Sequence, residues 1–317
     1  MSRVPAWLAA PPPDAAVEFS ADRVSAVTLA SRGRALVVSA HATAALPAGT
    51  VVPSFTHANV ADPAPAIAAL RQVFDRLGTR PRRVGLLLPD TAGKVSLVRF
   101  EKVPERADDL DQLIRLQVRK SAPFPIEEAQ VAWARGAPCA NGGREFLVVM
   151  ARRAVVTEYE TICRAAGATA GLVDLATVGL LNLVMAGPSA PAGDWLLVHM
   201  TADSTSIAIV RGTDVVFFRN RPEHEGEPLG DLVHQTRMYY EDRLQGGGFA
   251  RVLLAGASRA PGGPDDVRRD LEARIGGTVE PVDPRASVAL TDRILAAPDL
   301  LDALAPLVGL LLRARAA

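Results

Sequence analysis

The 317-residue sequence has few of the residues that build metal sites or nucleic-acid surfaces. Its two cysteines, Cys139 and Cys163, and its five histidines show no spacing typical of a zinc site. Two isolated thiols instead indicate a reduced, cytosolic protein. Basic charge is not in excess, because 35 basic residues balance 35 acidic ones and are scattered along the chain. A surface for nucleic acid is therefore not expected.

Long apolar runs are also missing. Pro5 and the prolines at 11–13 interrupt the N-terminal apolar patch, so we interpret residues 1–14 as a flexible lead-in and not as a signal peptide. The run from Ala303 to Leu312 has ten residues, whereas a bilayer-spanning helix needs about 20. We expect this run to form a buried helix, in a cytosolic protein without a membrane anchor of its own.

Apolar residues make up 49% of the chain, which is enough for two packed lobes. Their spacing repeats, because three short strands, an amphipathic helix and a buried strand occur in the first half and again in the second. The predicted segments are 17–19, 24–30, 35–40, 63–77 and 84–88, then 196–200, 205–210, 214–218, 229–244 and 252–254. The repeat predicts a two-lobed α/β protein with a cleft between the lobes.

Two polar turns occupy matched positions in this repeat. A shift of 181 positions places Ser20-Ala21-Asp22-Arg23 on Thr201-Ala202-Asp203-Ser204 without a gap. We expect these turns to face each other across the cleft, where a ligand would lie.

The segment between the two halves has its own pattern. Strands are expected at 94–100, 129–134 and 145–150, and helices at 108–120, 154–166 and 174–185, before a linker at 187–193. We interpret about 101–172 as a small subdomain inserted into a first lobe of residues 15–192. Residues 193–317 then form the second lobe.

The order of these elements is similar to that of one known family. This order of elements, together with four stretches of sequence, resembles the PilM family of type IV pilus assembly proteins over about residues 16–313. The stretches are SAPFPIEEAQVAW (121–133), GLVDLATVGLLNL (171–183), MYYEDRLQGGGFARVLLAGAS (238–258) and LAPLVGLLLR (304–313). The resemblance implies an actin-like (ribonuclease H-like) fold, related to the cytoplasmic part of the secretion protein GspL, with ATP and Mg2+ in the cleft.

The resemblance also implies a partner, the short cytoplasmic tail of the inner-membrane protein PilN, held between the first lobe's core and its subdomain. Other proteins of the pilus alignment complex are implied as further partners. Pro89, Asp90 and Thr91 lie near that junction, where an extended peptide could add to a strand edge. The stiff loop with Phe124 and Pro125 is a second candidate, although Phe124 could instead fill the subdomain's core.

For the nucleotide, the resemblance points to two turns and one loop. The matching residues are Glu18, Ser20, Asp22, Thr201, Asp203, Ser204, Thr205, Gly256, Ala257 and Ser258. Relatives carry a pattern like Asp-Ile-Gly at each turn, whereas this chain has Glu18-Phe19-Ser20 and His199-Met200-Thr201. In the loop after the buried strand 252–254, relatives carry Gly-Gly, and this chain keeps one of these glycines, Gly256.

These departures weaken the predicted site. Without the glycines, backbone N–H groups approach phosphate less closely, and His199 replaces a hard oxygen ligand for magnesium. No side chain has a strong claim to be a general base, which must lie within hydrogen-bond reach of the attacking water. We therefore expect a scaffold with a degenerate site, weak or no binding of ATP and Mg2+, and no metal ligand set or catalytic residue. An active ATPase of the same fold and a sugar-kinase-like phosphotransferase are the alternatives.

Overall fold

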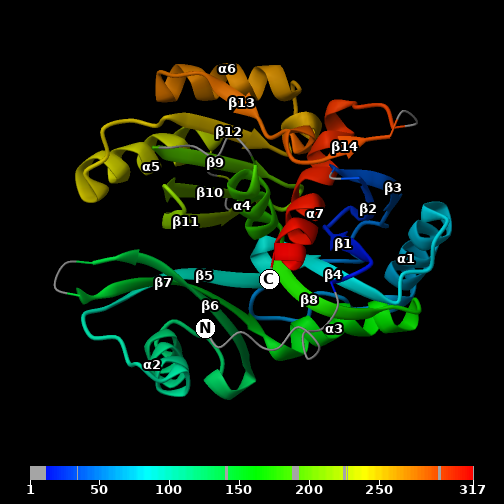
Figure 1. The fold of residues 1–317 in the computed structure, drawn as a ribbon, viewed down its shortest axis with the longest axis horizontal. Coiled ribbons are helices and arrows are strands. Elements are labelled where there is room, and N and C mark those ends of the chain that lie inside the picture. Colours follow the sequence, from blue (N-terminus) through cyan, green and yellow to red (C-terminus); the bar gives the residue numbers. More distant parts are fainter. Residues whose placement is uncertain are drawn as a thin grey trace.

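The computed structural model describes residues 12–33, 35–139, 142–187, 193–223, 226, 228–291 and 294–316. Most of the expected lead-in and of the expected linker at 187–193 lies outside the described residues. In the described part, the chain forms three β-sheets, with helices on both faces of the two larger ones (Figure 1).

The two larger sheets confirm the predicted repeat. In spatial order, the first contains β14 (Ala289–Leu290), β3 (Ala35–Ala45), β2 (Arg23–Arg32), β1 (Ala15–Phe19), β4 (Arg83–Leu88) and β8 (Thr169–Leu175). The second contains β11 (Asp214–Pro222), β10 (Ser204–Arg211), β9 (Asp194–Met200), β12 (Arg251–Ala255) and β13 (Val279–Pro281). β1 and β9 each pair antiparallel with the next strand of the chain and parallel with β4 or β12.

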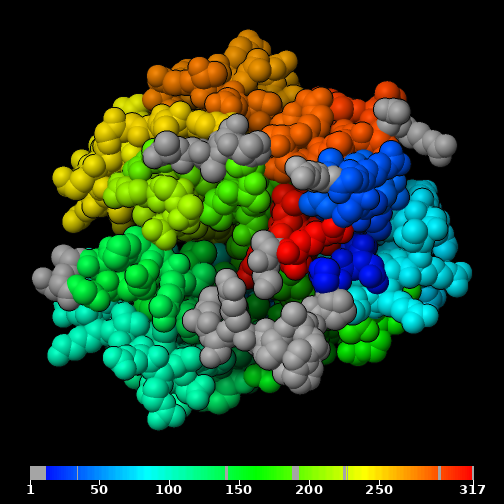
Figure 2. Space-filling view, viewed as in Figure 1, coloured from blue at the N-terminus to red at the C-terminus, as the bar shows by residue number. Residues whose placement is uncertain are grey.

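Helices form an outer layer on each sheet and a shared layer between the sheets. The outer helices are α1 (Pro63–Leu77) and α3 (Arg153–Ala165) on the first sheet and α5 (Leu229–Leu244) and α6 (Pro264–Ile275) on the second. The shared layer consists of α4 (Ala176–Ala186) and α7 (Pro298–Ala316). In the space-filling view, α7 (red) is visible between the two lobes (Figure 2).

Side-chain alternation explains these layers. Val17 and Phe19 of β1 belong to the outer core, whereas Ala16 belongs to the core shared with α4 and α7, because successive side chains of a strand point to opposite faces. α4 and α7 cross closely, since a Cβ on Gly309 would lie 1.8 Å from the carbonyl oxygen of Gly179. Among the residues described, no helix combines the length and apolar character needed to cross a bilayer.

The third sheet, with β5 (Gly93–Phe100), β7 (Arg144–Arg152) and β6 (Ala129–Pro138), forms the inserted subdomain together with α2 (Ala107–Arg119). It spans 93–152 and not about 101–172. α3 and β8 belong to the first lobe instead, because α3 packs on the outer core and β8 pairs with β4. One strand from the C-terminal half of the chain also belongs to the first lobe's sheet, because β14 pairs with β3.

Candidate functional site

The two matched turns have the same internal hydrogen bonds. The backbone N–H of Ser20 donates to the carbonyl three residues on (3.0 Å), and its hydroxyl donates to Asp22 (2.8 Å). Thr201 repeats both bonds, at 2.9 Å to the carbonyl and 3.1 Å to Asp203. A carboxylate that binds local groups stabilises a tight turn, so the hydroxyl-Ala-Asp pattern is sufficient to form each turn. Ser204 and Thr205 begin β10 and are buried.

Each turn is tied to the opposite lobe through its aspartate. Asp22 forms an ion pair with Arg259 (2.7 Å) in the short 3-10 helix η5 (Ala257–Arg259), which follows β12. Asp203 accepts a hydrogen bond from Thr91 (2.7 Å) in η1 (Asp90–Ala92), which follows β4. η1 and η5 have equivalent places in the repeat, so the two ties are related by the same duplication as the sheets.

The loop at 256–258 is held by a carboxylate from α7. Asp302 accepts hydrogen bonds from the backbone N–H groups of Gly256 and Ser258, both at 2.9 Å. Gly256 has a φ of 77°, and a Cβ there would lie 1.9 Å from the carbonyl oxygen of Met200. Packing of the loop against β9 therefore requires this glycine. Ala257 between the two donors is buried.

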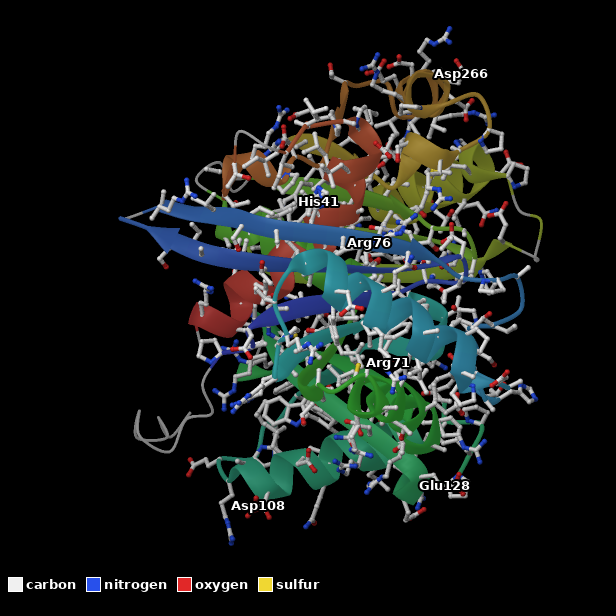
Figure 3. The ribbon with its side chains drawn as sticks, turned by 90° about the vertical axis from the view of Figure 1, so that its right-hand side faces the viewer. His41, Arg71, Arg76, Asp108, Glu128 and Asp266 are labelled. Carbon is white, nitrogen blue, oxygen red and sulfur yellow. The ribbon has the colours of Figure 1, made fainter. Side chains whose placement is uncertain are left out.

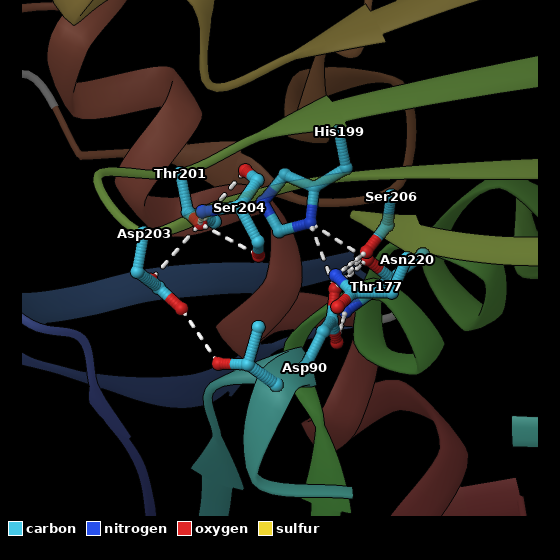
Figure 4. A network of polar contacts seen from close by, with 9 residues as sticks. Asp90, Thr177, His199, Thr201, Asp203, Ser204, Ser206 and Asn220 are labelled. Atoms are coloured by element: carbon cyan, nitrogen blue, oxygen red, sulfur yellow. Dashed lines mark hydrogen bonds and ion pairs between the residues drawn. The ribbon is translucent and has the colours of Figure 1, made fainter. Parts of the chain in front are cut away.

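A buried polar network lies next to the second turn (Figure 4). The Asp90 carboxylate accepts from the Ser206 hydroxyl (2.6 Å) and from the backbone N–H of Thr177 (3.0 Å), and it also contacts the Thr177 hydroxyl. Nδ1 of His199 lies 2.7 Å from that hydroxyl and 3.6 Å from the carboxylate. Asn220 donates to Ser206 (2.9 Å). Asp90 thus lies at the N-terminus of α4, where the helix dipole favours a negative charge.

Two buried carboxylates in this region differ in their partners. Burial alone would raise the pKa of Asp90, but the hydrogen bond and charge of His199, with hydrogen bonds from two hydroxyls, hold that pKa below its ordinary value. Glu18, 5% exposed at the end of β1, has one oxygen, Oε2, without a hydrogen-bond partner in the described structure. Burial raises the pKa of Glu18, and the charge of Arg23 opposes that rise.

Both turns border one cavity of about 1000 Å³. Ala21 and Ala202 line it from the two turns, and Lys94 lines it from β5. The turns therefore face a common space, as the repeat predicts, but no residue of 256–258 belongs to its lining. In the part of the chain that the structure describes, no group of three or more His, Cys, Asp or Glu residues is arranged to hold a metal ion.

A second cavity is a groove of about 570 Å³ between the subdomain and the first lobe, and residues 213–215 of the second lobe also line it. One wall is the face of the subdomain sheet opposite α2, with Leu147 and Val149, and the other includes Leu172 of β8. β8 and β6 are edge strands, and no described strand pairs with their outer edges. In the lining, Asp174 contacts Arg313, and burial raises the pKa of Asp174 to about 6 against the effect of that guanidinium.

The five residues predicted to contact a partner lie outside this groove. Pro89 and Asp90 are buried, and Thr91 is bonded to the second turn. Phe124 packs against the subdomain's core, as in the alternative interpretation, and Pro125 precedes η2 (Ile126–Glu128). Two connections join the subdomain to the first lobe, β4–β5 and β7–α3. The partner site was predicted at the β4–β5 connection, whereas the groove lies at the β7–α3 connection.

Sequence reasoning missed several residues that complete the cleft. Thr177 and Asp302 are polar residues in largely apolar helices, and Ser206 is a polar residue in a buried strand. Such positions are a usable signal, because a buried polar group is costly unless it has a partner. Arg259 offered no signal of this kind, since it lies in a polar connection.

The chain is similar to known proteins in sequence and in fold. Residues 16–242 match the family model for type IV pilus assembly protein PilM. The structure of a PilM-PilN type IV pilus biogenesis complex aligns with a TM-score of 0.78 at 21% identity, covering 95% of this chain and 98% of that one. A Bacteroides thetaiotaomicron protein with an actin-like ATPase fold and unknown function aligns at 0.48 and 11% identity, covering 85% and 90%. No curated protein matches the chain in sequence.

Two lobes with one strand order, a shared helical layer and matched turns across a cleft form an actin-like fold. The predicted fold class is thereby confirmed. Because the family model matches most of its length, the chain belongs to the family of type IV pilus assembly protein PilM.

Proposed function

We propose that the chain is a scaffold of the type IV pilus assembly machinery that binds the cytoplasmic tail of a PilN-like inner-membrane protein. Its family and the PilM-PilN complex with a similar fold support the proposal. The observation that carries it is the groove of about 570 Å³, which borders on two edge strands whose outer edges no described strand occupies. The chain would then lie on the cytosolic side of the inner membrane, attached through this tail.

An extended tail suits the chemistry of the groove. A strand added to β8 or β6 would pair with the free backbone N–H and C=O groups of that edge. Because its side chains alternate, one face of the tail would meet Leu147, Val149 and Leu172. Backbone pairing would supply affinity, and these apolar contacts would select the sequence of the tail.

We further propose that the cleft between the lobes is a degenerate nucleotide site. The aspartate of each turn binds a side chain of the opposite lobe. Asp302 accepts hydrogen bonds from the backbone N–H groups of Gly256 and Ser258. Donors that would meet a nucleotide thus have partners within the protein. The carboxylates of Asp22 and Asp203 would also repel a phosphate placed beside them. This arrangement disfavours an active ATPase or phosphotransferase.

Titration with a synthetic PilN-like tail peptide tests the partner proposal. Ala134 is an exposed residue of β6 that lines the groove, and Ala134→Glu places a bulky charge there. We expect saturable binding by the unchanged protein and a loss of at least about tenfold in Ala134→Glu, equivalent to about 1.4 kcal/mol. Ala107→Glu is the matched control, because Ala107 is exposed at the start of α2 and outside the groove. Absence of saturable binding, or an equal loss in both variants, would contradict the proposal.

A further inference from the structure

The outer surface of the first lobe carries a group of exposed arginines. The exposed members are Arg71 and Arg76 of α1, Arg80 and Arg82 of the connection to β4, and Arg164 of α3. Within the described part of the chain, no carboxylate forms an ion pair with any of these five, which we call the arginine surface. Arg71 and Arg76 are both on the face that Figure 3 presents.

Two of these side chains are held in place by neutral groups. Arg71 donates to the carbonyl of Ala165 (2.7 Å), and Arg76 donates to the carbonyl of Thr43 (2.8 Å). A carbonyl fixes a guanidinium without cancelling its charge. Asp75 and Glu160 are the acidic residues nearest to these arginines in the sequence, and Asp14, from the start of the chain, accepts from backbone N–H groups at 82 and 83. The surface therefore keeps a net positive charge.

The second lobe shows that arginines on an outer helix need not be unpaired. On α6, Arg268 pairs with Asp265 (3.0 Å) and Arg269 pairs with Asp266. Arg274 lies 3.5 Å from Asp231 and 3.7 Å from Asp270. Each guanidinium of α6 thus has a carboxylate next to it, so this helix presents little net charge.

The arginine surface adjoins one end of the tail groove. A hollow of about 450 Å³ is lined by Arg71, Asp75 and Arg80 together with Ala166 and Gly167 at the end of α3. Three residues after Gly167, Ala170 of β8 is part of the lining of the groove. At the same point the backbone N–H of Thr169 donates to the carbonyl of Arg82 (2.8 Å). A tail leaving this end of the groove would pass directly beside the arginines.

We propose that the arginine surface rests on the anionic lipid headgroups of the inner membrane. Its orientation relative to the tail rests on the proposed function, because the tail must reach the bilayer from the groove, whereas the lipid contact itself requires only the charge. An arginine near an anionic bilayer strengthens binding about fivefold. The attraction is screened within a Debye length, about 10 Å at 0.1 M salt, so high salt should release the protein.

Co-sedimentation of the full chain with lipid vesicles, without any tail peptide, tests this contact. The vesicles contain phosphatidylcholine with about one third phosphatidylglycerol, or phosphatidylcholine alone. We expect binding to the anionic vesicles only, and a loss of at least about tenfold in the triple variant Arg76→Gln, Arg80→Gln, Arg82→Gln. The matched control is Arg268→Gln, Arg269→Gln, Arg274→Gln, which removes the same charge from α6 and should bind within about twofold of the unchanged protein.

Equal losses in the two triple variants would overturn the proposal, because binding would then follow total charge. Failure of the unchanged protein to bind anionic vesicles would overturn it as well. Titration of the first triple variant with the tail peptide in solution separates the two proposals, since none of its three arginines lines the groove. The triple variant should therefore bind the peptide as the unchanged protein does. If the unchanged protein binds the peptide but not the anionic vesicles, only the lipid contact is wrong, and the reverse result contradicts only the proposed function.

Discussion

The two lobes share a strand order but differ at the matched ends of their first strands. Glu18 lies one residue before the end of β1, at the position that His199 holds on β9. His199 lies against Thr177 and Asp90, whereas Oε2 of Glu18 has no hydrogen-bond partner among the described residues. The duplication thus preserved topology and left the chemistry of equivalent positions free to change.

The outer helices differ in the same way. The arginines of α6 are paired with aspartates, and those of the arginine surface have no ion pair among the residues that the structure describes. Exposed ion pairs contribute little to stability, so the pairing on α6 matters more for removing net charge than for holding the fold. The proposed lipid contact of the first lobe would account for this contrast.

The largest effect is expected from Asp90→Ala. This change leaves the Ser206 hydroxyl and the Thr177 N–H without their acceptor in a buried region. We expect the free energy of unfolding to fall by about 3 kcal/mol or more, measured by urea denaturation at neutral pH. Asp22→Ala is the control, because its partner Arg259 is largely exposed, and it should cost at most about 1 kcal/mol. Similar losses in both variants would show that the buried network has no special weight.

A smaller effect of opposite sign is expected from Glu18→Gln. Removing a buried, partly unsatisfied charge should raise the free energy of unfolding by about 1–3 kcal/mol at neutral pH. The pKa of Glu18 is raised in the folded state from an ordinary value of 4.5, so its contribution is fully favourable below that value and is lost as pH rises through the folded pKa.

The stability difference between this variant and the unchanged protein should therefore be small in acid and grow toward neutral pH. Urea denaturation at several pH values measures it. A difference that does not change with pH, or a variant less stable at neutral pH, would mean that Glu18 has a partner in solution.

The repeat was predictable because it rests on local patterns. Alternation in β1 and β2 and the helical spacing of α1 recur in the second half, and both polar turns follow from the shift of 181 positions. β8 was not predicted, since its alternation is short and merges with the start of α4. The ties of the turns to Thr91 and Arg259 join segments far apart in the chain, and no local pattern encodes such a contact. The basic stretch at 80–83 is visible in the sequence, but whether its arginines are paired depends on the fold.

Mg-ATP is expected to leave the melting temperature unchanged. This experiment tests directly whether the two turns still bind a nucleotide between them. A ligand at 100 times its Kd should stabilise the folded chain by about 2.7 kcal/mol. If the ties to Thr91 and Arg259 and the bonds to Asp302 occupy the donors of the cleft, the melting temperature should stay unchanged at millimolar Mg-ATP. Mg-ADP and magnesium alone are the controls for nucleotide and cation effects. A rise in melting temperature with ATP that reaches saturation would contradict the degenerate site, and it would mean that the ties of both lobes open to admit a phosphate.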